Sequence, residues 1–267
     1  MNPAQALHAV LARVQQSDAP TVLGAWQQVL QAEATTSEFV LRHAEVVRLV
    51  ETIARRLIAS ASDGVTAEAL TMYLPSWYRA VVWQGHWQAA QEPPSGIITI
   101  EQMAYLGLFG KHEFAEEEHL TTAGLSTLRS NLDSWIVLLD ESTEILAPLR
   151  QQIRTQVEHV RWLLDNVDLL GTTPVVRESQ TLLGQVASAA TAQPLRLFST
   201  QRWKSAFAGL VVLLAGVAGA TGEAKIIISN VQQVYSAIEN WEQPALPAGE
   251  SAVRELPAAG IEPMSEK

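Results

Sequence analysis

The chain has 267 residues, 48% of them hydrophobic, so it can bury a sizeable core as one large domain or two small ones. Its formal net charge of −10 argues against nucleic-acid binding, which needs a basic face. It contains no cysteine, which excludes disulfides, a thiolate zinc site and a cysteine nucleophile.

Apolar residues recur at helical spacing along most of the chain, which predicts an all-α fold built as a multi-helix bundle. The first three helices are expected at residues 3–16, 20–34 and 37–61. The third should bury one apolar face, made of Phe39, Val40, Ala44, Val47, Leu49, Val50, Ile53, Leu57 and Ile58. Its charged residues are expected mostly on the opposite, solvated face: Arg42, Glu45, Arg48, Glu51, Arg55 and Arg56.

Shorter helical patterns follow, separated by proline. A helix is expected to begin at Thr66, and Pro75 must end or kink it. Residues 91–96 are expected to form a loop, and Thr99 can cap the next short helix. The inner residues of that helix are expected to be Met103, Leu106 and Leu108.

The longest helical pattern runs over residues 122–170 and contains Pro148, so we expect two helices there or one kinked helix. Gly171 ends this pattern, and a further helix is expected at residues 174–191.

The stretch from Ser205 to Gly222 carries no charge and has to be hidden from water. A helix of this length spans about 27 Å, the thin end of a bilayer core, but it can equally be buried inside a helical bundle. Trp203 and Lys204 suit a membrane interface. Gly209 and the small residues at helical spacing allow close helix association: Ala215, Gly216, Ala218, Gly219, Ala220 and Gly222.

The end of the chain changes character twice. An amphipathic helix is expected at residues 226–241, with Ile226, Ile227, Val231, Val234, Ile238 and Trp241 apolar. It is either a second helix or a continuation of the apolar one, with the charged Glu223 and Lys225 where they join. Residues 242–267 are rich in proline, alanine, glycine and glutamate and are expected to be an acidic, disordered tail. The expected organisation is a helical body at 1–200, the apolar and amphipathic helices at 201–241, and the tail.

Parts of the chain resemble a family of uncharacterised bacterial all-α proteins with a Gly/Ala-rich apolar C-terminal segment. The features that carry the resemblance are Ala25–Leu30, the leucine-rich pattern over residues 157–170 with Gly171, and the stretch from Trp203 to Gly222. The resemblance is diffuse and implies an all-α body with an apolar end, but no activity and no functional residue.

Chemical motifs are weak. On a helix, His112, Glu116 and His119 would share a face and could hold a divalent ion, but the zinc-peptidase pattern H-E-x-x-H is missing. A solvated acidic turn that starts the next helix is the simpler interpretation. His159 and Trp162 are interpreted as core or surface residues and not as ligands. The sequence has no nucleophile elbow and no phosphate loop, so we expect a non-enzymatic protein with no cofactor and no metal site.

Two functional hypotheses remain open. In the first, the protein associates with a membrane through residues 203–241 and self-associates there, as a cell-damaging or defence effector. The start of the chain lacks the pattern of a signal peptide, so its body would be cytoplasmic and anchored to the inner membrane. In the second, the protein is a soluble helical adaptor, inhibitor or immunity-like protein with residues 205–222 as its core helix. Its acidity favours a basic protein partner in both.

Overall fold

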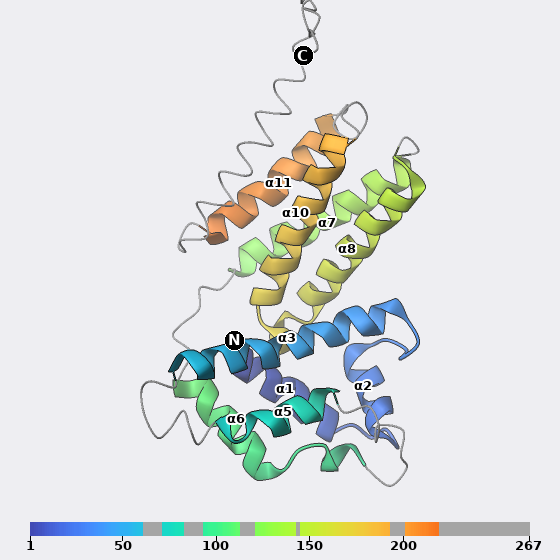
Figure 1. Cartoon of the computed structure of the whole chain (residues 1–267). Helices are drawn as coiled ribbons and strands as arrows, with labels where there is room; N and C mark the ends of the chain where they lie inside the picture. Colours follow the sequence, from blue (N-terminus) through green and yellow to red (C-terminus); the bar gives the residue numbers. More distant parts are fainter. Residues whose placement is uncertain (61–70, 83–92, 113–120, 143–144, 193–200, 219–267) are drawn as a thin grey trace, which may run out of the picture.

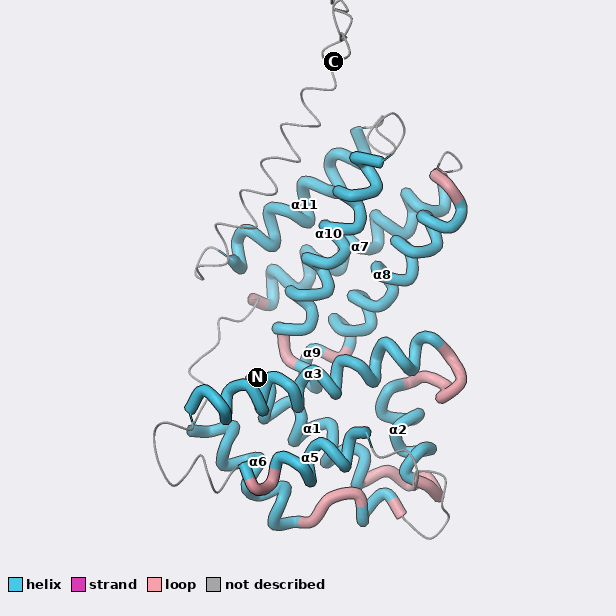
Figure 2. The backbone as a smooth tube through the Cα atoms, viewed as in Figure 1, coloured by secondary structure: helices cyan, strands magenta, loops and turns pink. Residues whose placement is uncertain are grey.

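The computed structural model describes residues 1–60, 71–82, 93–112, 121–142, 145–192 and 201–218. Within these ranges the backbone forms helices joined by loops and turns, without a strand (Figures 1 and 2). The predicted all-α fold is therefore confirmed. The helices fall into two groups, one from each half of the chain, which meet end to side near the N-terminus (Figure 1). The predicted amphipathic segment 226–241 and the tail 242–267 lie outside the described residues.

The first group surrounds the N-terminal helix. Its members are α1 (Pro3–Gln15), α2 (Val22–Leu30), α3 (Ser37–Ser60), α5 (Leu74–Val82), the short 3-10 helix η3 (Pro94–Gly96) and α6 (Ile100–His112). Helix α1 contacts α2, α3 and α6, and its face of Ala6, Leu7, Val10 and Val14 is fully buried. Burial of this stripe holds the group together, since each buried aliphatic side chain contributes about 1.5–3 kcal/mol.

Local capping chemistry sets where several of these helices begin. Asn2 forms a reciprocal capping box with Gln5, and its amide also donates to the carbonyl of Gly110 at 2.6 Å, which ties α1 to α6. Thr99 caps α6 as predicted, because its hydroxyl accepts from the backbone N–H of Gln102. Helix α2 ends at Leu30, earlier than predicted, because Gln31 adopts a left-handed conformation with φ 53°.

Three expectations about burial in this group are wrong. Val40 and Ile58 of α3 are 63% and 73% exposed, and Leu108 of α6 is 49% exposed. Each lies beside the apolar stripe and not on it. In α6 the buried hydrophobic side chains are those of Met103, Leu106 and Phe109, and Leu108 points about 200° away from Leu106. The expectation for Glu45 is wrong in the opposite sense. It was expected on the solvated face of α3, but its side chain is completely buried.

The second group is a four-helix bundle. It consists of α7 (Thr122–Glu141), α8 (Ala147–Asp165), α10 (Thr173–Ala192) and α11 (Gln201–Ala218), with the single turn α9 (Val167–Leu170) between α8 and α10. Contacts run from α7 to α8, α8 to α10, α10 to α11 and α11 back to α7, so the ring of helices is closed. The predicted break near Pro148 is confirmed, because Pro148 lies in the first turn of α8.

Ion pairs fix the register of α7 against α8. Arg129 pairs with Asp165 at 2.6 Å, Asp133 with Arg161 at 3.0 Å, and Asp140 with Arg154. Every step forward along α7 is matched by an equal step backward along α8, as antiparallel neighbours require. Each exposed pair contributes only about 0.2–1 kcal/mol, so the series matters more for alignment than for stability.

Helix α11 closes the bundle through a close contact with α7. The ring of Trp203 packs edge-on against Trp135 at 5.4 Å, and its indole N–H donates to the Ser142 hydroxyl at 3.1 Å. Further along, the Asn131 amide donates to the carbonyl of Ala206 at 3.1 Å. A Cβ on Gly209 would overlap with the Asn131 amide nitrogen, so glycine here leaves room for the Asn131 side chain between the two helices.

No helix in the described part of the chain combines the length and the apolar content that a membrane crossing needs.

The α7–α11 contact predicts opposite effects for two glycine substitutions. Gly209→Ala forces Asn131 to move and breaks its bond to Ala206, so thermal unfolding should show a loss of about 1–2 kcal/mol. Gly184 in α10 has open space within 4 Å of the position that a methyl group would take, so Gly184→Ala should stabilise the protein by about 0.5–1 kcal/mol. Removing the Asn131 side chain as well should restore part of the loss; equal effects at the two glycines would rule out the close contact.

Candidate functional site

The two helix groups meet chiefly through two contacts, α1 against α9 and α3 against α8. At the first, Gly171 adopts a φ of +77°, and a Cβ there would lie 2.8 Å from the carbonyl oxygen of Met1. Only glycine combines this backbone conformation with such a close approach. The predicted helix stop at Gly171 is confirmed, and the same residue also lets the N-terminus reach the junction.

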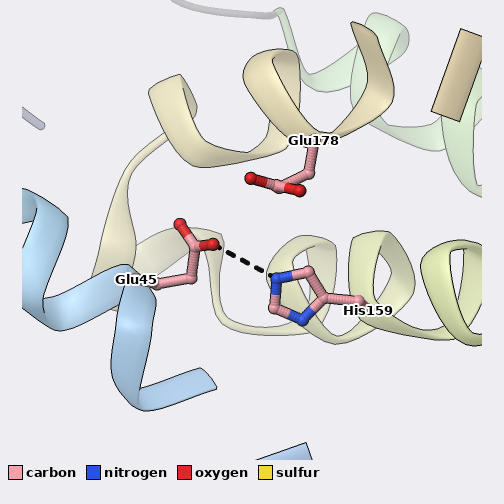
Figure 3. Close-up of side chains that lie close together, drawn as sticks. All are labelled: Glu45, His159 and Glu178. Carbon is pink, nitrogen blue, oxygen red and sulfur yellow. Dashed lines mark hydrogen bonds and ion pairs between the residues drawn. The ribbon is translucent and has the colours of Figure 1, made fainter. Parts of the chain in front are cut away.

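A buried cluster of titratable side chains lies at the second contact (Figure 3). Glu45 comes from α3, His159 from α8 and Glu178 from α10, and in Figure 3 the three side chains point toward one another. His159 Nε2 lies 3.3 Å from Glu45 Oε1, and one ligand-type atom of each residue lies within 4.8 Å of the others. Three separate helices therefore bring an imidazole and two carboxylates to one point.

Two arginines complete this cluster. Arg48 donates to Glu45 Oε1 at 2.5 Å and reaches Glu178 Oε1 at 3.3 Å. Arg177 donates to Glu45 Oε2, and its Nε donates to Glu178 Oε1 at 3.1 Å. Gln156 donates to Glu178 Oε2 at 2.9 Å. Every carboxylate oxygen of the two glutamates therefore has a partner, as buried acceptors require.

The pKa of Glu45 reflects this surrounding. Burial pushes it upward and is the largest single effect, but the hydrogen bond with His159 and the charges of Arg177 and Arg48 act together against it. The net result is a pKa below the ordinary value, so Glu45 is ionised at neutral pH although its side chain is completely buried.

The donor set could in principle hold a divalent cation, because imidazole and carboxylate are ordinary ligands for zinc or manganese. The charge balance argues against it. Two glutamates face two arginines, so the cluster is neutral when His159 is neutral, and a divalent ion would add two positive charges beside both guanidinium groups. The arrangement is better described as an ion-pair network that joins α3 to α8 and α10.

Aromatic contacts extend the same junction. The Arg42 guanidinium lies 5.0 Å from the ring centroid of Trp162, and the ring of His159 stacks near that of Trp162 with centroids 6.1 Å apart. Arg42 also donates to the carbonyls of Leu30 and Gln31 at the end of α2. His159 and Trp162 are both buried, as core residues.

The residues predicted to contact a membrane or to mediate self-association differ in their burial. Trp203 is 3% exposed, Lys204 and Gly209 are half-buried, and Ala215, Gly216 and Ala218 lie along the backbone of α11. Gly219, Ala220 and Gly222 lie outside the described residues, as do Glu116 and His119 of the predicted metal face, while His112 is the last residue of α6.

Comparison of the chain with protein-family models, with curated proteins and with solved structures finds no match. The resemblance to a bacterial all-α family stays a prediction.

Substitution of the buried Glu45 should cost more stability than substitution of a glutamate in an exposed ion pair. Glu45→Ala leaves Arg177, Arg48 and His159 without their shared acceptor and should cost about 3 kcal/mol in the free energy of unfolding, measured with urea. Glu51→Ala, further along α3, removes an exposed pair with Arg55 and should cost about 0.5 kcal/mol or less. Similar losses for both would refute the network.

Acid should weaken the network in a defined direction. The pKa of Glu45 is lower in the folded protein than its ordinary value of 4.5, so its stabilising effect is complete above that value and is lost as the pH falls through the folded pKa. Glu45→Gln cannot show this loss. The stability difference between the natural protein and Glu45→Gln should therefore shrink below about pH 4.5; a difference that stays constant with pH would contradict the assignment.

Proposed function

We propose that this chain is a non-enzymatic helical protein-binding module, in which α11 is a core helix of the C-terminal bundle. The observation that carries the proposal is the buried face of α11, where Trp203, Phe207 and Leu210 are at most 3% exposed. An apolar helix whose side chains already pack against α7 and α10 has little to gain from transfer into lipid.

The polar groups of α11 support the same proposal. The indole N–H of Trp203 has its acceptor in Ser142, within the protein. A tryptophan that anchors a helix at a bilayer surface instead directs its N–H toward the headgroups. Arg202 pairs with Glu141 of α7 at 2.5 Å, which also directs this end of α11 toward the bundle.

An exposed apolar stripe on α6 supports the proposed binding of a partner. Ile100, Ala104 and Leu108 are exposed at a spacing of four residues, which places them in one stripe along the helix, and Ile100 is 89% exposed. Exposed apolar stripes of this kind are typical of protein-binding surfaces. With the net charge of −10, they favour a partner that combines an apolar patch with a basic rim.

Membrane association through residues 203–241, with self-association there and a cell-damaging or defence role, is the second candidate. It is favoured by the absence of any charged residue from Ser205 to Gly222 and by the exposure of Val212, which is 70%. It would require α11 to leave the bundle and give up the contacts of Trp203.

The contact face can be tested by charge insertion at two exposed isoleucines. Ile100→Lys should abolish capture of the partner by tagged full-length protein, because a lysine in the apolar stripe has to be desolvated on binding. Ile58→Lys, at a residue of α3 that is 73% exposed, is the matched control and should capture the same partner. Both variants should keep the melting temperature of the natural protein.

The natural protein and the two lysine variants also distinguish the proposed module from membrane association, the second candidate. The natural protein should stay in the bottom fraction when floated with vesicles of neutral or anionic lipid, and should capture its partner without detergent. Flotation with vesicles, or a capture that Ile58→Lys and Ile100→Lys change equally, would overturn the proposed module.

A further inference from the structure

The exposed side of α6 carries opposite charges at the two ends of its apolar stripe. Ile100, Ala104 and Leu108 lie within an arc of about 80° around the helix. Lys111 falls inside the same arc near the C-terminal end, and Glu101 lies about 20° outside it near the N-terminal end. Both charged residues are exposed, so the stripe runs from an acidic end to a basic end.

The acidic end of the stripe is held in place by two tyrosines. The Tyr73 hydroxyl donates to Glu101 Oε1 at 3.1 Å, and the rings of Tyr73 and Tyr105 stack with centroids 4.3 Å apart. Neither Glu101 nor Lys111 forms an ion pair with another described residue. Both charges therefore remain available for a molecule that covers the stripe.

A second copy of the chain is complementary to this side of α6 in one antiparallel register. With a two-fold axis level with Leu106, Glu101 of each copy lies level with Lys111 of the other. The same register sets Ala104 level with Leu108 of the other copy, a small side chain against a large one. A parallel pair would instead place Glu101 beside Glu101 and Lys111 beside Lys111, and these like charges repel.

The overall acidity of the chain does not prevent this contact. Each copy has a net charge of −10, but the Debye length at physiological salt is about 8 Å, so distant charges are largely screened and those beside the stripe decide. One face of a 13-residue helix is small beside the roughly 1,200 Å² that stable interfaces bury. The dimer should therefore be weak and form only at high protein concentration.

We propose that α6 is a self-association site, at which two copies of the chain pack antiparallel and Glu101 of each copy pairs with Lys111 of the other. The inference rests on the proposed binding of a partner by the α6 stripe and names a second copy as the occupant. Any other partner of the stripe has to displace the second copy, so dimer formation and binding of that partner exclude each other.

Charge reversal tests the register, because the two single variants are complementary to each other. Glu101→Lys and Lys111→Glu should each weaken the dimer on the order of tenfold, since like charges then meet at both ends of the contact. Sedimentation of the full-length protein over a range of concentrations measures this change. An equimolar mixture of the two variants should recover the association of the natural protein, because both pairs in the mixed dimer are again opposite in charge.

The exposed pair of α3 provides matched controls. Glu51→Lys and Arg55→Glu change the net charge by the same amounts, away from the stripe. Both controls should associate as the natural protein does.

Cysteine cross-linking gives a second measurement, because the chain has no native cysteine. Preparations of Glu101→Cys and Lys111→Cys, mixed under mild oxidation, should form a disulfide-linked dimer. Each preparation alone should cross-link on the order of tenfold more slowly, because identical positions lie about 15 Å apart along the helix axis in this register.

The outcomes separate this inference from the proposed function. A natural protein that sediments as a monomer at every concentration would overturn self-association and leave the capture of another partner intact. Association that neither reversal weakens, or that the mixture does not restore, would overturn the α6 site, and equal cross-linking in the mixture and in the single preparations would overturn the register. The proposed function fails separately, if Ile58→Lys and Ile100→Lys change the capture of a partner equally.

Discussion

The close approach of α11 to α7 is the contact on which the C-terminal bundle depends. Gly209 leaves room for the Asn131 side chain, which donates to the carbonyl of Ala206. The same approach lets Trp203 reach Trp135 and Ser142. The buried face of α11 is covered by α7 and α10, and without this approach it would lose the cover of α7. The least polar stretch of the sequence is therefore held by a polar hydrogen bond as well as by packing.

The junction of the two helix groups depends on charge as well as on packing. Glu45, Glu178, Arg48 and Arg177 balance one another, and this removes much of the cost of burying a carboxylate where α3 crosses the bundle. A network of this kind contributes little net stability compared with an apolar contact, but it accepts only one arrangement of the three helices. It therefore restricts how the N-terminal group sits on the bundle.

Local signals in the sequence predicted the helices well. Pro148, Gly171 and Thr99 each act on the backbone within one turn, so their effect is visible without knowledge of the tertiary fold. The C-terminal end of α2 was missed, because a left-handed glutamine has no clear sequence signal. The buried stripes were predicted less well where apolar residues lie beside them, as at Val40 and Leu108.

The charged cluster could not be predicted as a site, because His159 and Arg177 lie 114 and 132 residues from Glu45 in the sequence. A weaker signal was present. Glu45 lies four residues before Leu49 on the apolar stripe of α3, and Glu178 lies four residues before Leu182 on that of α10. A carboxylate in register with buried leucines indicates a buried charge that needs a partner. The sequence does not show which partner it finds, since that depends on how the helices cross.

The ion pairs between α7 and α8 also have a consequence for errors in assembly. If α8 slipped by one helical turn in one direction, Arg129 would face Arg161; in the other direction, Asp133 would face Asp165. Either slip replaces an attraction with a repulsion, which adds to whatever preference the buried apolar seam has for the native alignment. The exposed ion pairs therefore disfavour both shifted alignments of α7 and α8, although each pair contributes little to stability.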